Sequence, residues 1–346
     1  MIHSRIRITP NLRNIFWLTL LFSLACIFAV RASAQQDGDI DTIKVDSSLV
    51  QLNVGVVDQR GRSIVNLSRN DFAVYEDNVQ QKVLSFEPST SPFSLVLLLD
   101  MSSSTQGFRK PLKLSAFRFL DALSADDRVA IVAFKEKAEL LSDFTSDHAK
   151  MGYAIENAEG KGKTELFKAL VFALEKLSHE GKRRKAIVVL TDGLDIPMMD
   201  ADRAASASAD SNDSAVAAIK PEKSSALNGV LNLADRMGVT IYPLALPSGD
   251  PRHIPIPTPQ QIAIYTSARA RLQTLADRTG GRLNAINRIE EMGRLYAEVA
   301  ADMRTLYSVV YQSTSEKVRD GKWRAIRVEV AQPQLLARTR PGYFAR

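Results

Sequence analysis

The sequence predicts an α/β fold in which a doubly wound, mostly parallel sheet is flanked by a small β-sandwich formed from the N- and C-terminal segments. Two observations predict it. Between residues 93 and 304, short apolar runs alternate with amphipathic stretches, which is typical of a parallel sheet covered by helices on both faces. On either side of that region, apolar and polar residues alternate one by one, which indicates half-buried antiparallel strands.

Residues 1–34 predict a secretory signal peptide. Arg5, Arg7 and Arg13 precede an apolar run over residues 15–30, and three small residues then offer a cleavage site. The apolar run is shorter than the roughly 20 residues that a membrane span usually needs. An uncleaved anchor is the alternative, and only then do we expect membrane contact. Either interpretation places the rest of the chain outside the cytoplasm, as a secreted, periplasmic or cell-surface protein.

The single cysteine, Cys26, lies inside this leader. A lipid attachment site is an alternative interpretation there, but the residues before Cys26 fit that motif poorly. Without the leader, the chain has neither a disulfide nor a thiol nucleophile. Its stability outside the cell then rests on core burial and on any bound metal.

The charge of the mature chain argues against a nucleic-acid partner. The net charge is +6, but the leader holds four arginines and no acidic residue. Removing those four from 45 basic residues leaves 41 against 39 acidic ones, a net charge of +2. A balance so close to zero gives no indication of a nucleic-acid-binding surface.

The two flanking segments, residues 35–92 and 305–346, are predicted to be rich in strands. The first contains an alternating stretch over residues 50–56 and a turn over residues 58–61; further extended stretches cover residues 72–75, 82–86, 307–311 and 323–330. Neither segment is large enough to bury a core by itself. We therefore expect them to pair with each other, with the α/β domain inserted between halves of one sandwich; two separate sheets are the alternative.

The central segment, residues 93–304, is predicted to form the parallel sheet and its helices. A helix is expected over residues 164–177, where apolar residues fall on one face. Residues 200–223, rich in Ala, Ser and Asp, predict a mobile surface loop or a weak helix. The proline-rich residues 247–259 predict an irregular connection that could border a binding face. The buried strands are expected at Leu95–Leu99, Val129–Phe134, Ala186–Leu190 and Val239–Leu244.

Oxygen-bearing side chains follow two of these strands at the point where each ends. Asp100, Ser102 and Ser104 come directly after the first strand, and Thr191 and Asp192 follow the third. In an open parallel sheet, ligands bind at the carboxyl ends of the strands. Hard oxygen groups gathered there suit Mg²⁺, and the sequence gives no support for a soft-metal site.

These residues resemble the metal-ion-dependent adhesion site of von Willebrand factor A domains. The similarity covers roughly residues 93–304 and rests on Asp100-x-Ser102-x-Ser104, then Thr164, then Asp192 with its Thr-Asp-Gly context. It implies a Rossmann-like sheet, with Mg²⁺, or alternatively Mn²⁺ or Ca²⁺, at the site. It also implies that the two serines and Thr164 are ligands, that the two aspartates hold waters and balance charge, and that an acidic group of a protein or peptide partner completes the shell. The whole chain further resembles exported bacterial proteins related to this family.

Simpler structural roles are open for several of these residues. Thr164 could cap the helix that follows it, and Asp192 could belong to a turn. Asp195 could lend charge to the site or lie in a surface turn, and Gly107 could bend the loop or only begin a helix. The stretch 160–164 superficially resembles a phosphate-binding loop, but its spacing is wrong and it does not follow a predicted strand.

An enzymatic function is the competing hypothesis. A metal-assisted phosphoester hydrolase could use Asp100 or Asp192. It would need an additional base or nucleophile, and the mature chain has only His148, His179 and His253, none in a recognisable triad context. We therefore expect a binding protein rather than an enzyme. A structural module with an unused site is the third hypothesis, and the sequence specifies neither the partner nor the oligomeric state.

Overall fold

The structure, a computed structural model, describes residues 49–181, 183–314 and 320–345. The chain divides into two compact units, and all described residues belong to the second, Ser47–Arg346. The expected signal peptide at residues 1–34 lies outside the described residues. Among the helices that the structure describes, none is both long and apolar enough to cross a membrane.

The central part of the described chain contains a six-stranded sheet in the order β10-β9-β8-β5-β6-β7. Its ladders are parallel, apart from β7, which runs antiparallel to β6 at the edge. Every residue of β5, β8 and β9 is buried, as expected for strands covered on both faces. The predicted fold class is confirmed. The strands are β5 (Phe93–Asp100), β6 (Arg128–Phe134), β7 (Ala138–Thr145), β8 (Arg184–Thr191), β9 (Val239–Ala245) and β10 (Asn284–Ala285).

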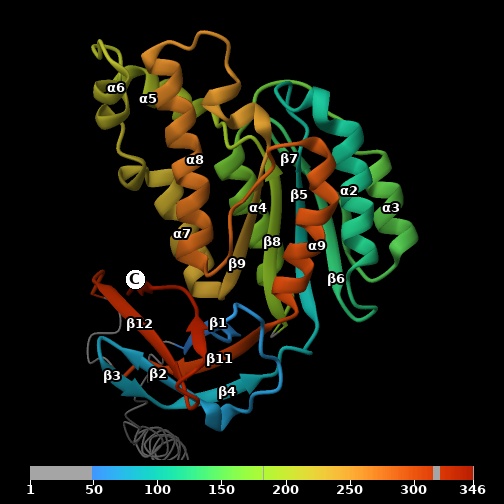
Figure 1. Ribbon diagram of the computed structural model, residues 1–346. Helices are drawn as coiled ribbons and strands as arrows, with labels where there is room; N and C mark the ends of the chain where they lie inside the picture. Colours follow the sequence, from blue (N-terminus) through green and yellow to red (C-terminus); the bar gives the residue numbers. More distant parts are fainter. Residues whose placement is uncertain (1–48, 182, 315–319, 346) are drawn as a thin grey trace, which may run out of the picture. The chain divides into compact units, whose positions relative to one another are not determined.

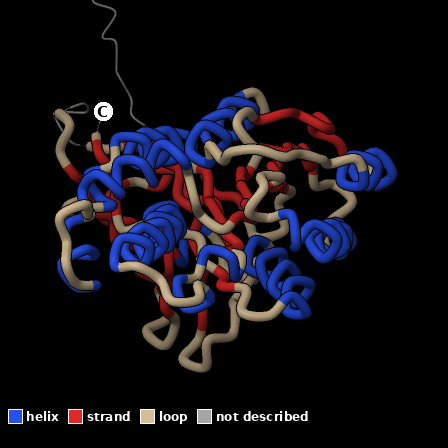
Figure 2. Tube along the Cα trace, turned by 90° about the horizontal axis from the view of Figure 1, so that it is seen from above, coloured by secondary structure: helices blue, strands red, loops and turns tan. Residues whose placement is uncertain are grey.

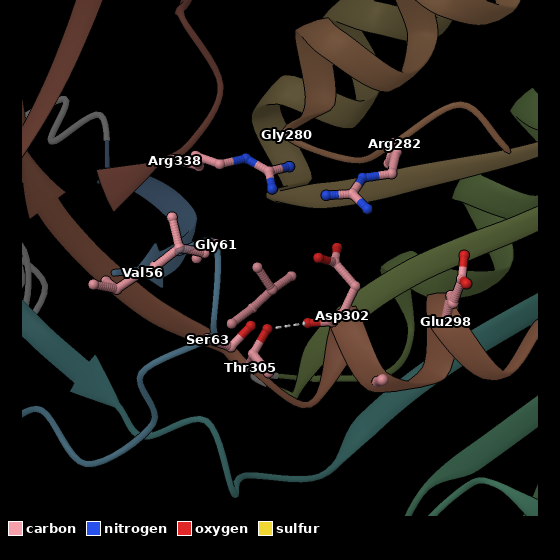
Figure 3. Close-up of a pocket in the computed structure, with 13 residues that line it drawn as sticks. Val56, Gly61, Ser63, Gly280, Arg282, Glu298, Asp302, Thr305 and Arg338 are labelled. Atoms are coloured by element: carbon pink, nitrogen blue, oxygen red, sulfur yellow. Dashed lines mark hydrogen bonds between the residues drawn. The ribbon is translucent and has the colours of Figure 1, made fainter. Parts of the chain in front are cut away.

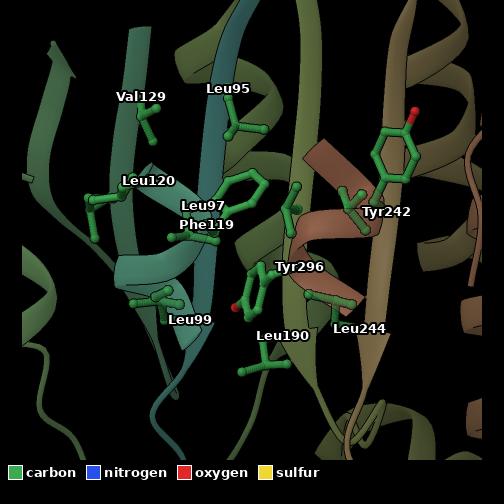
Figure 4. Packing of buried hydrophobic residues seen from close by; sticks show 14 of the residues in the cluster. Leu95, Leu97, Leu99, Phe119, Leu120, Val129, Leu190, Tyr242, Leu244 and Tyr296 are labelled. Atoms are coloured by element: carbon green, nitrogen blue, oxygen red, sulfur yellow. The ribbon is translucent and has the colours of Figure 1, made fainter. Parts of the chain in front are cut away.

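Helices cover both faces of this sheet, and Figure 2 shows them on both sides of the strands. One face packs against α2 (Arg109–Asp121), α3 (His148–Glu156) and α9 (Met292–Met303), and the other against α4 (Leu166–Ser178), α7 (Ser225–Met237) and α8 (Pro259–Thr279). Successive residues of β5 point to opposite faces: Leu97 joins the core beneath α2 and α9, and Leu98 joins the core beneath α4. In the first core, the rings of Phe119 and Tyr296 pack 5.3 Å apart (Figure 4).

The flanking segments form two four-stranded sheets that share one core, as the joined-sandwich hypothesis expects. Their orders are β13-β1-β11-β4 and β14-β12-β2-β3, so each sheet combines strands from before and after the α/β domain (Figure 1). Leu52 pairs with Val309 in the first sheet, Val74 pairs with Val328 in the second, and all four side chains are buried in the same cluster. The strands are β1 (Leu49–Val57), β2 (Phe72–Glu76), β3 (Val79–Gln81), β4 (Val83–Glu87), β11 (Leu306–Gln312), β12 (Trp323–Val330), β13 (Leu336–Arg338) and β14 (Gly342–Phe344).

The sandwich contacts the α/β sheet at the edge where β8 and β9 begin. Arg184, the first residue of β8, donates to the carbonyl oxygens of Ser89, Ser91 and Leu306. A pocket of about 240 Å³ lies at this junction, with Arg282 and Arg338 above Asp302 (Figure 3). The junction is therefore at the opposite edge of the sheet from the strand ends that carry Asp100 and Asp192.

Residues 200–223 are not the mobile loop that was one of the two expectations. They contain most of α5 (Ile196–Ala205), all of α6 (Asn212–Ala218) and a 3-10 turn at Pro221–Lys223. A buried, two-bonded ion pair from Arg271 of α8 to Asp202 holds α5 in place, with N–O distances of 2.6 and 2.7 Å. Residues 247–258 form the irregular connection that was predicted. The other 3-10 turns are Arg69–Asp71, Gln106–Phe108, Pro247–Gly249, Pro251–His253 and Ile289–Glu291.

Candidate metal centre

The sheet register brings Asp100 and Asp192 to the same edge. Strands β5 and β8 are hydrogen-bonded neighbours in which Leu99 lies opposite Leu190. Asp100 is the last residue of β5, and Asp192 directly follows the last residue of β8. Because the strands are parallel, both carboxylates leave the sheet at its carboxyl edge, where they are almost fully buried, with 0% and 1% of their surface exposed.

Among the described residues, neutral groups donate the hydrogen bonds that the Asp100 carboxylate accepts. Its Oδ1 accepts the backbone N–H of Ser102 at 3.0 Å, and its Oδ2 accepts the hydroxyl of Thr191 at 2.7 Å. Thr191 belongs to the sequence motif, but the sequence alone assigned it no role. Its position at the end of the neighbouring strand was the available signal, but the hydrogen bond depends on the register of β5 against β8.

The loop after β5 brings two predicted ligands together. The hydroxyl oxygens of Ser102 and Ser104 lie 3.1 Å apart. Thr105 supports this turn from within, because its hydroxyl donates to the carbonyl oxygens of Asp100 at 2.8 Å and of Ser102 at 3.0 Å. Arg109 donates to the carbonyl oxygen of Met101 at 3.1 Å. The backbone of the loop is thus fixed by its own residues, and the hydroxyls of Ser102 and Ser104 lower the pKa values of Asp100 and Asp192, respectively.

Asp192 keeps one oxygen without a partner. Its Oδ1 accepts the N–H of Leu194 at 3.1 Å, but its buried Oδ2 accepts no hydrogen bond from the described residues. Gly249 packs against the backbone here so closely that a Cβ at that position would lie 1.9 Å from the carbonyl oxygen of Asp192. A buried carboxylate oxygen with no donor is costly unless an ion or water completes it.

Neither carboxylate forms an ion pair within the described part of the chain, although the charge of Asp192 acts on Arg269 and opposes the fall that burial causes in its pKa. Burial and, to a smaller extent, the charge of Asp192 raise the pKa of Asp100 to about 7, against the hydrogen bonds from Ser102 and Thr191. Burial also raises the pKa of Asp192, which the hydroxyl of Ser104 opposes. Two buried acids that disfavour each other's charge are stabilised together by a cation. The available oxygens, hydroxyl and carboxylate, are ligands of the type that Mg²⁺ prefers.

Thr164 lies in a loop that is tied to both strand-end segments. Its carbonyl oxygen accepts the N–H of Ile196 at 2.9 Å, and the carbonyl and N–H of Gly162 bond to the N–H and hydroxyl of Ser103 in the loop after β5. The alternative role as helix cap is wrong, because the N-cap of α4 is Glu165, which makes no capping bond through its side chain. Thr164 is 4% exposed. Thr164 is therefore buried in a loop that is hydrogen-bonded to the two segments that hold the other four predicted ligands.

The structure also assigns positions to the two residues whose roles were open. Asp195 is a buried N-cap of α5: it accepts the N–H groups of Met198 and of Phe167, both at 3.2 Å. It therefore joins the starts of two helices and does not lie in a surface turn. Gly107 lies in a 3-10 turn, where a Cβ would meet no atom within 4 Å. The stretch 160–164 follows α3 and not a strand, which agrees with rejecting it as a phosphate-binding loop.

The site is poor in the residues that commonly form metal clusters. Within the described ranges, no three His, Cys, Asp or Glu side chains come close enough to hold an ion together. At this site the hydroxyls of Ser102 and Ser104 lie beside the two carboxylates in place of a third acidic or histidine side chain. The five predicted residues thus come from three segments at one sheet edge. Four of them are linked directly, either by a hydrogen bond or by an effect of one on the pKa of another: Asp100, Ser102, Ser104 and Asp192.

Comparison with known proteins supports the fold of this region. A model of the von Willebrand factor type A domain matches residues 95–194. The human voltage-dependent calcium channel subunit alpha-2/delta-2 is 29% identical over 128 residues, covering 34% of this chain and 11% of that protein. An uncharacterized Synechocystis protein, sll0103, is 31% identical over 109 residues, covering 30% of this chain and 25% of that protein. This chain therefore matches only a small part of each relative's length.

Solved structures show similar but divergent domains. A von Willebrand factor type A protein from Catenulispora acidiphila superposes with a TM-score of 0.46 and 14% identity, covering 88% of this chain and 64% of that one. The von Willebrand factor domain of the pilus tip protein Mfa5 from Porphyromonas gingivalis gives a TM-score of 0.45 and 15% identity, covering 61% and 95%. The match to the von Willebrand factor type A domain thus spans residues 95–194, which run from β5 to just beyond β8.

Proposed function

We propose that this chain is an exported binding protein that captures an acidic group of a protein or peptide partner through a divalent cation. Asp100, Ser102, Ser104, Thr164 and Asp192 would hold the cation, with Mg²⁺ as the first choice and Mn²⁺ or Ca²⁺ as alternatives. The observation that carries the proposal is the pair of buried carboxylates, one with an oxygen that lacks a donor, and neither in an ion pair among the described residues.

The division between charged and neutral groups explains how such a site would attract an acid. Ser102, Ser104 and Thr164 supply neutral hydroxyls, and Asp100 is already held by neutral donors from Ser102 and Thr191. A divalent cation bound among them supplies a positive charge that none of the five ligand groups carries, and it binds a carboxylate oxygen directly. Because three of the five ligand groups are neutral, an acidic group of the partner can complete the shell around the cation.

A metal-assisted hydrolase is the competing function, and no contact in the site favours it. His148 begins α3 and His179 follows the last residue of α4, so neither belongs to the loops that carry the two aspartates. General acid–base catalysis needs a group within hydrogen-bond reach of the reacting atoms. The relative alpha-2/delta-2 is a subunit of a calcium channel and so works in an assembly of proteins. This supports a role for the present chain in protein binding.

Calorimetric titration of Mg²⁺ and Mn²⁺ into the purified mature chain tests the metal site. We expect binding by the wild type and its loss in Ser102→Ala/Ser104→Ala. The matched control is Ser142→Ala/Ser178→Ala, because both of these exposed hydroxyls bond to nearby backbone carbonyls outside the site. Equal metal binding by the wild type and the first variant would remove these hydroxyls from the mechanism.

Two further measurements separate capture from catalysis. Pull-down from an extracellular fraction should recover a partner in the presence of Mg²⁺ and lose it with chelator. Incubation with a generic phosphoester should give no turnover. Turnover that disappears in Asp100→Ala would overturn the binding function and favour the hydrolase.

A further inference from the structure

A basic hollow borders the loop that carries Ser102 and Ser104. Its volume is about 550 Å³, and four cationic side chains line it: Arg109, Lys113, Lys135 and Lys161. Glu159 is the acidic residue among its lining. The mature chain as a whole is almost neutral, so this concentration of positive charge is a local feature of the metal-site edge.

Close packing fixes the hollow relative to the metal site. The backbone N–H of Ser103 donates to the carbonyl oxygen of Gly162 at 3.0 Å, and the N–H of Gly162 donates to the hydroxyl of Ser103, also at 3.0 Å. Gly162 has φ +128°, which other residues rarely adopt. A Cβ on Gly160 would lie 2.6 Å from the carbonyl oxygen of Met101. The two glycines therefore let the lysine-bearing loop lie directly against the loop of the predicted ligands.

Two of the lysines form no ion pair with an acidic residue among those that the structure describes. Lys161 is exposed and Lys135 is half-buried, and neither forms an ion pair with another residue that the structure describes. By contrast, Lys168, a few residues along, pairs with Glu165 at 2.6 Å. The guanidinium of Arg109 donates to carbonyl oxygens of the metal-site loop, so it stabilises the wall of the hollow and is not free to bind a partner. The charges of Lys135 and Lys161 remain available to an external group.

We propose that the partner presents a cluster of acidic residues, in which one carboxylate meets the bound cation and its neighbours occupy the basic hollow. This inference rests on the proposed function and adds the partner's chemistry to it. Complementary charge around a binding site raises the association rate and selects the partner. In this proposal, the stretch Gly160-Lys161-Gly162-Lys163 holds positive charge next to the metal site and does not bind phosphate.

Binding of a fluorescent hexaglutamate peptide, followed by anisotropy in Mg²⁺, tests the inference. A peptide of equal length with one glutamate and five glutamines is the comparison. We expect the wild type to bind hexaglutamate more tightly, and Lys135→Gln/Lys161→Gln to weaken that binding by about five- to tenfold, since exposed ion pairs are individually weak. The one-glutamate peptide should be almost unaffected. The matched control, Lys82→Gln/Lys322→Gln, removes two exposed lysines of the sandwich and should change neither affinity.

The outcomes separate this inference from the function on which it rests. If chelator abolishes hexaglutamate binding but the Lys135/Lys161 variant binds as the wild type does, the metal site stands and the basic hollow has no role. If chelator has no effect while the lysine variant weakens binding, metal-mediated capture fails. Heparin or polyphosphate that binds this surface more tightly than hexaglutamate, and with the same lysine dependence, would overturn the choice of an acidic peptide.

Discussion

The two edges of the central sheet bury charge in opposite ways. At the edge where the strands begin, Asp235 is paired with Arg340 at 3.1 Å and with Arg278 at 3.0 Å, and all three belong to the junction with the sandwich. At the edge where the strands end, Asp100 and Asp192 are equally buried, but they meet neutral donors or none in the part of the chain that the structure describes.

This difference separates a structural role from a binding role. Burial raises the pKa of Asp235, but both arginines oppose that rise. At the same edge, burial lowers the pKa of Arg184 to about 10, which still leaves it protonated at neutral pH. Its guanidinium donates to the carbonyl oxygen of Ser89, between the sandwich and β5. The junction is thus compensated by the chain itself. Compensation for Asp100 must come from outside, either as a proton or as a metal ion.

The largest expected effect is the loss of compensation at the junction. Arg340→Ala should lower the free energy of unfolding by about 3 kcal/mol, because removing one partner leaves a buried charge of Asp235 poorly compensated. Urea unfolding followed by circular dichroism measures it. Arg338→Ala is the control: this exposed arginine of β13 has no ion pair in the described chain, and its loss should cost less than about 0.5 kcal/mol. Similar losses in both variants would mean that the buried pairing at Asp235 is not what stabilises the junction.

A neutral substitution at the other edge should have the opposite sign. In chelator, Asp192→Asn should raise the free energy of unfolding by about 1–2 kcal/mol, because it removes the charge that raises the pKa of Asp100 while keeping an oxygen for the N–H of Leu194. The same variant should lose the stabilisation that Mg²⁺ gives to the wild type, measured as a shift of the Tm. A destabilised Asp192→Asn in chelator would show that this edge is compensated after all.

The pH dependence of stability should distinguish the metal-free from the metal-bound protein. The folded-state pKa of Asp100 is raised to about 7 from 3.8, so the native state binds a proton more tightly than the unfolded state does. Without metal, the stability contributed by this group is present at low pH and is lost as pH rises from about 4 to about 7. We expect the Tm in chelator to fall across that range, and Mg²⁺ to reduce the fall by replacing the proton. A Tm in chelator that rises throughout this range would contradict the shift.

Local pattern predicted the strands well because their burial is local. The buried runs at β5 and β8 extend only one or two residues beyond their predicted ends, and the strand-end rule placed Asp100 and Asp192. Strand β7 was missed because most of its residues are only half-buried, as at an antiparallel edge. The helix α5 was left open against a mobile loop, because it is held by an ion pair between Asp202 and Arg271, which are 69 residues apart.

The contacts within the site were harder to predict for the same reason. The bond from Thr191 to Asp100 needs the register of two strands that are 91 residues apart, and the Ser103–Gly162 bonds need a loop from a third element. Residue type alone allows the hydroxyl of Thr164 either to bind a metal or to cap a helix. The capping role was excluded only by the position of the N-cap of α4, at Glu165.

The smallest effect is expected from two buried threonines, one at each edge. Thr191 in β8 donates to Asp100 at 2.7 Å, and Thr240 in β9 accepts from Asn53 at 2.8 Å. Replacing either by Val keeps the shape and removes the hydroxyl, so each variant should lose about 1 kcal/mol of unfolding free energy. Calorimetry should then separate them: Thr191→Val should weaken Mg²⁺ binding several-fold, because Asp100 loses a donor that favours its ionised form, whereas Thr240→Val should bind Mg²⁺ as the wild type does. Equal Mg²⁺ affinity in both variants would place the Thr191 hydroxyl with the structural bonds of the sheet and leave the metal site to the loops alone.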